Sequence, residues 1–458
     1  MAEKQLARVM SPVSMLAMAT GIIVGPWLVM MPWWFSLTGS SISLAFVLTA
    51  IVVVPIGYIY AELCPMLPYT GGSFIYAGSA MGPVWGFIGG WVLLLPYVGV
   101  VAFQTMATVE LIKFLWFPDM GFTQLLIVAI IWIVFFCLLN SYKLITSAQL
   151  QFFFFIVLAV IAFIVEGILF PASGQWSTSN LQPFFATGSE GFLIAFGLMI
   201  SMYFGFDCVP QLVEESNFDL RLMPKIIIGS IFLSMLIYVV VCLAIGGMRD
   251  WQFIKDTPFV EAVVGDQVFG PAMKYFIALG ALGAIFTCFN GFWISCTRIF
   301  YSMGRSNLMP RKFGELNKWN IPGWTNIPVA VLALIMILLS GTAWLEIIFT
   351  VQAIGIILAY FLTCIASVVL RTKHPEWKRP YKMPGGIIMS VLGLICCSLL
   401  FYYSAQGVPK EGWFIIFVYL LIGLAIYGYM GLKRKQSPEE YTVFLPEGVV
   451  EQDKGIKG

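Results

Sequence analysis

The sequence has little charge, almost no histidine and no long polar stretch. Only 10% of its 458 residues are charged against 60% that are hydrophobic, and His374 is the single histidine. A water-soluble globular protein carries about a quarter of its residues charged, so that class is excluded. One imidazole supports neither a multi-histidine zinc or haem site nor an HExxH metalloprotease. The net charge of +2 indicates no basic surface for nucleic acid.

The cysteines and glycines do not form the usual cofactor motifs. The nine cysteines fall within or at the ends of apolar runs, without spaced pairs in loops. This placement indicates small core residues and not a disulfide framework or metal site. No Gly-Lys-Ser or Gly-Lys-Thr follows Gly71-Gly72, so a phosphate-binding loop is not indicated. We therefore expect no cofactor.

Apolar runs bounded by charge, proline or glycine predict twelve membrane-spanning helices, each of about 20 residues or more. The predicted ranges are 12–35, 41–62, 84–113, 122–140, 148–170, 191–213, 224–246, 271–302, 326–344, 346–370, 386–405 and 412–432. With this segmentation, twenty of the 25 lysines and arginines lie on the side of the termini. Because cytoplasmic loops are enriched in positive charge, we expect a multi-pass protein of the cytoplasmic membrane, surrounded by lipid, with both termini in the cytoplasm.

Two of the predicted helices contain residues that interrupt an α-helix. The range 12–35 contains Gly21 and then Gly25-Pro26-Trp27, and the range 191–213 contains the run from Tyr203 to Asp207. Unwound backbone at mid-membrane is tolerated only where protein buries it or a wet cavity meets it. Five crossings separate the two helices, which makes them antiparallel and predicts an inverted five-helix repeat with a substrate between the breaks. The alternative is that glycine and proline only kink these helices.

Several short motifs occur in order along the chain. They are Tyr60-Ala61-Glu62-Leu63, Pro68 to Tyr76, Gly86 to Trp91, Gly205-Phe206-Asp207 with Glu214-Glu215, Asn290-Gly291 with Arg298, Met309-Pro310, and Arg371 to Tyr381. In this combination the sequence resembles the amino acid, polyamine and organocation transporter superfamily over residues 12–432. The resemblance implies an all-α integral membrane protein that works by alternating access on amino acids or related amines.

The resemblance also implies a division of the chain. Its parts are a tail at 1–11, a first five-helix repeat at 12–170, a second inverted repeat at 191–370, two accessory helices at 386–432 and a tail at 433–458.

Two positions depart from the pattern of the superfamily. Many relatives have Gly-Ser-Gly at the first break, where backbone amides hold the substrate carboxylate, whereas this chain has Gly25-Pro26-Trp27. Either the remaining amides suffice to bind the carboxylate, and Trp27 narrows the pocket for a small substrate, or the substrate has another head group. Leu158 stands where some sodium-independent members carry a lysine. Coupling to sodium, coupling to a proton and plain exchange therefore all stay open.

The candidate substrate-binding residues gather at the two breaks and on neighbouring helices. They are Gly21, Gly25, Pro26, Trp27, Tyr97, Tyr203, Phe204, Gly205, Phe206 and Phe292. Backbone carbonyls at the second break suit a substrate amine, and the aromatic rings suit occlusion and a cation contact. For each ring, packing in the core is an equally good interpretation.

The candidate coupling or gating residues are Asp207, Thr287, Asn290, Trp293 and Ser295. An intramembrane carboxylate is costly, so Asp207 either takes up a proton, senses the substrate amine or bonds amides of the break. The hydroxyl and amide oxygens suit a sodium ion, although such groups more often bond neighbouring helices.

Two further acids, Glu110 and Glu166, fall toward the outer ends of their helices. We interpret both as solvated or snorkelling residues, with a role in binding as the alternative.

These observations predict a secondary active transporter, either a symporter or an exchanger, for an amino acid or a small organic amine. A carrier of polyamines or other amines is the alternative within the same fold. A channel would need a continuous polar pore lining. An intramembrane enzyme would need a nucleophile with a base, and His374 lies in a basic loop, so we expect no enzyme.

Overall fold

The apolar segments of the chain fold into helices. The computed structural model describes residue 6, residue 8, residues 10–141 and residues 158–448. Within these residues there is no strand, only an isolated bridge between Met10 and Ser216. The prediction of an all-α membrane protein is confirmed.

Long helices occupy the predicted segments. They are α1 (Pro12–Ile23), α2 (Trp27–Thr38), α3 (Ile42–Met66), α5 (Pro83–Trp116), α6 (Phe122–Leu139), α8 (Ile161–Ala172), α9 (Gly188–Leu198), α10 (Met223–Met248), α13 (Pro271–Arg305), α14 (Asn326–Ser340), α15 (Trp344–Lys373), α16 (Ile387–Gln406) and α17 (Lys410–Gln436). The part of the predicted helix 148–170 before residue 158 lies outside the described residues.

Several short helices occur where the sequence predicts only loops or continuous α-helix. The α-helical ones are α4 (Ser73–Met81), α11 (Trp251–Asp256) and α12 (Val260–Phe269). The 3-10 helices are η1 (Gly39–Ser41), η3 (Thr178–Leu181), η4 (Met199–Met202), η5 (Phe206–Glu215), η6 (Leu220–Leu222), η7 (Arg311–Gly314), η8 (Gly323–Thr325) and η9 (Gly341–Ala343).

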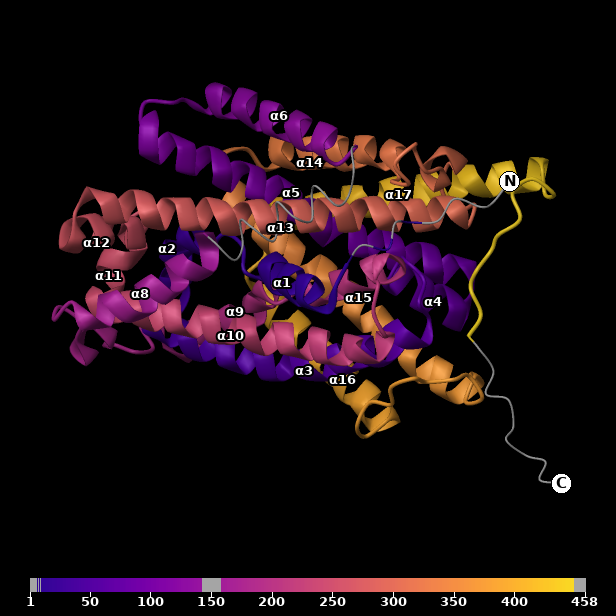
Figure 1. Cartoon of the computed structure of the whole chain (residues 1–458), viewed down its shortest axis with the longest axis horizontal. Helices are drawn as coiled ribbons and strands as arrows, with labels where there is room; N and C mark the ends of the chain where they lie inside the picture. Colours follow the sequence, from indigo (N-terminus) through magenta and orange to yellow (C-terminus); the bar gives the residue numbers. More distant parts are fainter. Residues whose placement is uncertain (1–5, 7, 9, 142–157, 449–458) are drawn as a thin grey trace.

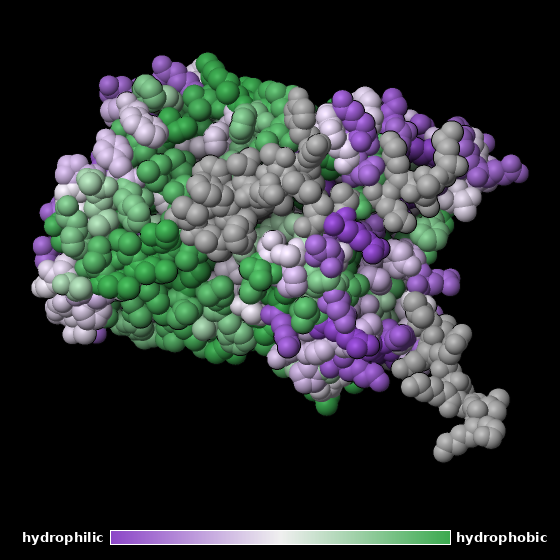
Figure 2. Space-filling view, viewed as in Figure 1, coloured by the Kyte–Doolittle hydropathy of each residue, from purple (hydrophilic) through white to green (hydrophobic). Residues whose placement is uncertain are grey.

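Apolar surface lies between two more polar ends on the face of the molecule seen in Figure 2. Among the described residues, nine spans are long and apolar enough to cross a membrane, and two of these, Trp27–Met66 and Gly323–Lys373, each contain two helices joined by a tight turn. Apolar side chains cover the middle of the surface in Figure 2, and polar ones gather toward both ends. The number of twelve crossings stays a prediction.

The helices divide into an inner and an outer group. In the apolar part of α5, 94% of the residues are buried, and in α13 83%, whereas the values for α6 and α17 are 22% and 28%. The exposed apolar faces of the outer helices suit lipid. Among the inner helices, α5 packs on α13 and α15, and α1 packs on α13 (Figure 1).

We name the two ends of the bundle by their short helices. The α4 end, at the right of Figure 1, also contains the C-terminal part of α17. The α12 end, at the left, contains α11 and α12. Helix α5 runs from one end to the other, and the two helix breaks lie between the ends.

Candidate functional site

Helix α1 gives way to α2 through Val24, Gly25 and Pro26. The N–H of Val24 still donates to the carbonyl of Thr20, at 2.9 Å, but Pro26 has no N–H with which to continue the helix. A side chain at Gly25 would collide with the side chains of Gln104 and Cys288. The first break is therefore packed tightly against α5 and α13.

The second break follows α9. The helix tightens into η4, and the chain turns at Tyr203–Gly205 before η5 begins. Gly205 has a φ of 137°, which favours glycine. A Cβ added at Gly205 would lie 2.8 Å from Cγ1 of Ile23 and 3.1 Å from its backbone nitrogen. The two breaks therefore contact each other directly.

Asp207 is a structural part of the second break. It is fully buried, and its Oδ1 accepts a hydrogen bond from the N–H of Gly205 at 2.7 Å. Its Oδ2 accepts one from the hydroxyl of Tyr97 on α5 at 2.6 Å. Both carboxylate oxygens thus have protein donors, which hold the turn in shape and tie it to α5.

A small cavity lies where the two breaks meet. Its volume is about 20 Å³, which is room for about one water molecule. It is lined by residues of α1, the first break, α5, η4 and the turn after it, α13 and α15. These residues are Ile22, Ile23, Pro26, Val100, Phe103, Gln104, Ser201, Met202, Phe204, Cys288, Phe292, Phe349 and Gln352. A substrate larger than water can enter only if aromatic side chains move.

Three of the lining residues are polar and uncharged. Ser201 donates to the carbonyl of Phe349 at 3.2 Å. The carbonyl oxygen of Gln104 and the amide nitrogen of Gln352 are buried and have no hydrogen-bond partner in the described structure. A buried polar group without a partner costs about 1–3 kcal/mol. The cavity therefore offers one acceptor and one donor to a ligand.

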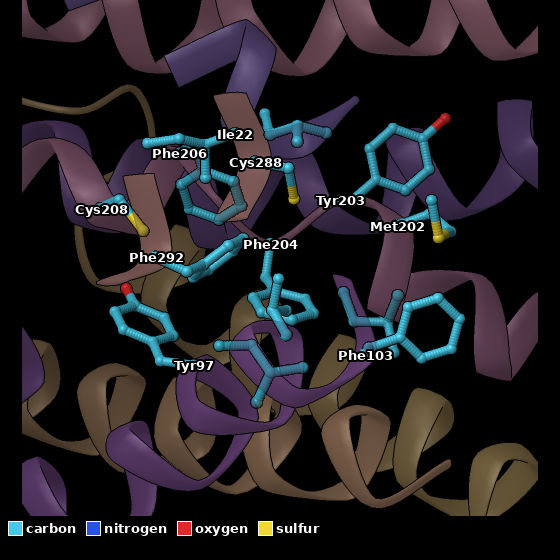
Figure 3. Packing of buried hydrophobic residues seen from close by; sticks show 14 of the residues in the cluster. Ile22, Tyr97, Phe103, Met202, Tyr203, Phe204, Phe206, Cys208, Cys288 and Phe292 are labelled. Atoms are coloured by element: carbon cyan, nitrogen blue, oxygen red, sulfur yellow. The ribbon is translucent and has the colours of Figure 1, made fainter. Parts of the chain in front are cut away.

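Aromatic rings close one side of the cavity. The ring of Phe292 lies 5.0 Å from those of Tyr97 and Phe204, and Tyr97 stacks on Phe204 at 6.4 Å (Figure 3). The hydroxyl of Tyr203 points away from this group and donates to the carbonyl of Phe46 at 2.8 Å (Figure 3).

The predicted substrate-binding residues thus divide into three groups. Pro26, Phe204 and Phe292 line the cavity. Gly25, Gly205 and Tyr97 shape the breaks around it. Gly21, Trp27, Tyr203 and Phe206 are buried but are not among its lining residues.

The predicted coupling residues on α13 all have partners in the protein. The hydroxyls of Thr287 and Ser295 each donate to a carbonyl one turn earlier, at 2.8 Å. The Oδ1 of Asn290 accepts from an asparagine at the end of α6, at 3.0 Å, and the indole of Trp293 donates to one at the start of α14, at 2.7 Å. The bonds of Thr287 and Ser295 lie within α13, whereas those of Asn290 and Trp293 hold α13 against α6 and α14.

Ion pairs seal the α4 end. Nε of Arg298 lies 2.7 Å from Oε1 of Glu215, and both side chains are buried. Arg371 binds Glu62, which also accepts from the N–H of Met383 at 2.8 Å. The two ion pairs therefore join α13 to η5 and α15 to α3 at this end.

The α12 end is more open. A vestibule of about 430 Å³ lies between α2, α5, α11 and α15 and is lined in part by Glu110, Lys255 and Asp256. The interpretation of Glu110 as a solvated residue agrees with this position. Glu166, by contrast, is fully buried, so its interpretation as solvated is wrong.

A layer of aromatic rings separates the vestibule from the cavity. Trp33 and Trp344 line the vestibule, and Phe103 and Phe349 line the cavity. The rings of Trp33 and Phe349 lie 4.9 Å apart, and those of Phe103 and Trp344 5.0 Å apart. The α12 end thus has one layer of aromatic rings between the vestibule and the cavity, whereas ion pairs close the α4 end.

Sequence reasoning missed Gln104, Ser201 and Gln352. The available signal for the two glutamines was their position, since Gln104 lies within the apolar run 84–113 and Gln352 within the apolar run 346–370. Polar groups in such runs face the bundle interior in most cases.

The site is buried at two helix breaks, with an open vestibule on one side and ion pairs on the other. This arrangement is typical of a membrane transporter. Residues 10–426 match the family of amino acid permeases, and the chain belongs to this family. The resemblance seen in the sequence is thereby confirmed, as are the predictions of a secondary transporter and of a protein that is not an enzyme.

Curated relatives match over nearly the whole chain. A branched-chain amino acid permease of Lactococcus lactis is 25% identical, covering 95% of this chain and 97% of its own length. A methylthioribose transporter of Bacillus subtilis is 24% identical, with 93% of both chains covered. An aspartate-proton symporter of the same organism is 24% identical and covers 86% of this chain and 79% of its own length.

Proposed function

We propose that the protein carries a small neutral amino acid with an apolar side chain across the cytoplasmic membrane, together with a proton. The observation that supports this best is the lining of the cavity at the two breaks. None of the described lining residues is an aspartate, glutamate, lysine or arginine. A polyamine carries several positive charges and would need carboxylates there, because an unpaired buried charge is too costly.

The two amides in the cavity suit the two ends of a zwitterion. The amide nitrogen of Gln352 is a donor for a carboxylate, and the carbonyl oxygen of Gln104 is an acceptor for an ammonium group. Pro26 has removed one backbone amide from the first break, so Gln352 replaces a donor that the break has lost. The apolar remainder of the lining suits an aliphatic side chain.

The two ends of the bundle suit alternating access. The excess of lysine and arginine on the side of the termini supports a cytoplasmic α4 end and a vestibule that opens to the outside. The described conformation then has a sealed inner gate and a thin outer aromatic gate. We propose residues 12–170 and 191–370 as the two inverted repeats that move against each other, residues 386–432 as accessory helices, and 1–11 and 433–458 as cytoplasmic tails.

A proton is the coupling ion that the chain supports best. The Oδ1 of Asn290, which would ligate sodium, already accepts a hydrogen bond from α6, and the hydroxyls of Thr287 and Ser295 are directed toward carbonyls of their own helix. One relative is named as a proton symporter.

Counterflow in proteoliposomes tests this function. Vesicles containing purified protein are loaded with unlabelled L-leucine and diluted into labelled L-leucine. We expect internal leucine to accelerate uptake of the label, because only a carrier exchanges its substrate. A rate of label uptake that is the same with and without internal leucine would indicate a channel.

A thermal-shift screen of amino acids and amines identifies the substrate class, because a ligand of the folded state raises the melting temperature. Stabilisation by putrescine and not by any neutral amino acid would contradict the proposed substrate.

A further inference from the structure

Two carboxylic acids are fully buried near the α12 end, outside the cavity. Glu166 lies on α8 and Glu261 on α12, and neither side chain is accessible to solvent. Within the described structure, no oxygen of either carboxyl group has a hydrogen-bond partner. An ionised carboxylate in such a place costs several kcal/mol. Such acids keep a proton unless a partner or water stabilises the charge.

Helices α8 and α12, which carry the two acids, are in contact where Phe170 stacks on Phe269 at 6.0 Å, and Glu166 lies beside Trp27, the first residue of α2. The indole N–H of Trp27 lies near the carboxyl of Glu166 and is buried without a hydrogen-bond partner in the described structure. The indole ring packs on Phe163 at 4.5 Å, one turn before Glu166 on the same face of α8. Burial raises the pKa of Glu261 well above its ordinary value, and the charge of Glu166 raises it further.

Among the described residues, no positive charge pairs with the acids of the cluster. Helix α8 packs on α10 and α13, and α12 packs on α2 and α13. Trp27 on α2 faces Glu166, and Cys242 on α10 interacts electrostatically with Glu261. No lysine or arginine of the described chain forms an ion pair with either acid. Two like charges in one buried place cannot both ionise at ordinary pH, so the pair titrates as a unit.

The cluster lies between the vestibule and the first break. Pro258 and Phe259 line the vestibule, and α12 begins one residue later and carries Glu261. On the other side, Trp27 directly follows Pro26, which lines the cavity. A change of charge on the acids therefore acts on the half-helix that borders the cavity.

We propose that Glu166 and Glu261 form the proton-binding site of the transport cycle, filled from the vestibule and connected to the substrate cavity through Trp27. This proposal rests on the proposed function as a proton-coupled carrier. With a shared proton, α2, α8 and α12 pack closely around the acids. Loss of the proton leaves two like charges in a dry interface, which separates these helices and shifts α2.

Isosteric variants test the site. Glu166→Gln and Glu261→Gln remove the titrating groups and keep the volume, and Glu346→Gln at the exposed start of α15 is the matched control at the same end. Uptake of labelled L-leucine is driven by an inward proton gradient without sodium, and leucine exchange is measured at equal pH on both sides.

We expect both cluster variants to lose gradient-driven accumulation, down to the level without a gradient, and to keep exchange. Glu346→Gln should keep both activities. Unchanged accumulation in the two cluster variants would overturn the proposal. So would accumulation in the wild type that follows a sodium gradient alone.

A second measurement does not depend on the substrate. Infrared spectra of the wild type over a pH series should show the carbonyl band of a protonated carboxyl that persists at neutral pH and is altered in both cluster variants. If this band is present but leucine is not exchanged, the proposed substrate is wrong and the site stands. If leucine is exchanged but the band is absent or unchanged by the variants, the site is wrong and the carrier function stands.

Discussion

Replacing Gly205 with alanine is the sharpest test of the contact between the two breaks. Gly205 adopts a φ of 137° and a ψ of −32°, a conformation that costs about 1–3 kcal/mol for a residue with a side chain. The new Cβ would lie 2.8 Å from Cγ1 of Ile23, 2.9 Å from Cγ2 of Ile22 and 3.1 Å from the backbone nitrogen of Ile23. Overpacking of this kind costs about 1–3 kcal/mol more.

The combined cost is about 2–6 kcal/mol, which either destabilises the protein or pushes the breaks apart. Thermal unfolding of the purified protein and leucine exchange in proteoliposomes measure the two effects. Gly428→Ala on α17 is the matched control, because a Cβ there meets nothing within 4 Å. Alanine is the better helix former by about 1 kcal/mol, so the control should be neutral or slightly stabilising.

Gly205→Ala should melt below the control and exchange leucine more slowly. If it melts and exchanges like the wild type, the breaks do not meet at Gly205, and the proposed position of the substrate is wrong.

Four further predictions follow from the same contacts. Gln352→Met, which keeps the volume and removes the donor, should raise the KM for leucine uptake about tenfold, the equivalent of about 1.4 kcal/mol; an unchanged KM would remove this amide from substrate binding. Asp207→Asn should lower the melting temperature but keep the pH dependence of uptake, because Asp207 holds the break through two accepted hydrogen bonds; a flat pH profile would make it the proton carrier instead. Arg298→Met leaves Glu215 buried without its partner and should cost about 3–5 kcal/mol of stability, which Glu215→Gln in the same chain should partly restore; an unaffected single variant would show that the pair does not seal the α4 end. Burial raises the pKa of Glu261 in the folded protein above its ordinary value of 4.5, so the stability that this residue contributes falls as the pH rises above 4.5. The melting temperature of Glu261→Gln should therefore decline less steeply with pH than that of the wild type, and parallel declines would contradict the raised pKa.

The positions of the helices and of the first break could be predicted from the sequence because their causes are local. Pro26 lacks an N–H whatever surrounds it, and long apolar runs form helices in a membrane. Helix α12 (Val260–Phe269) was missed because it is short and mixed in polarity, and hydropathy alone detects only long apolar runs. The 3-10 form of η5 was missed because tertiary packing at the break decides between related helix types.

The cavity lining was harder to predict. In helices that are apolar on every face, periodicity does not show which side faces inward. Gln104 and Gln352 were therefore overlooked, and Trp27 was expected in the cavity although it packs against α8. Glu166 was misread because only the fold shows that it is buried beside Glu261.

Alkylation of Cys288 shows whether the substrate binds where the two breaks meet, because this thiol lines the cavity there. In a variant whose other cysteines are replaced by alanine, a small maleimide should label Cys288 as the protein cycles in proteoliposomes, and L-leucine should slow the labelling in proportion to its occupancy. Labelling at the same rate with and without saturating leucine, in a protein that exchanges leucine, would place the substrate elsewhere and contradict the account.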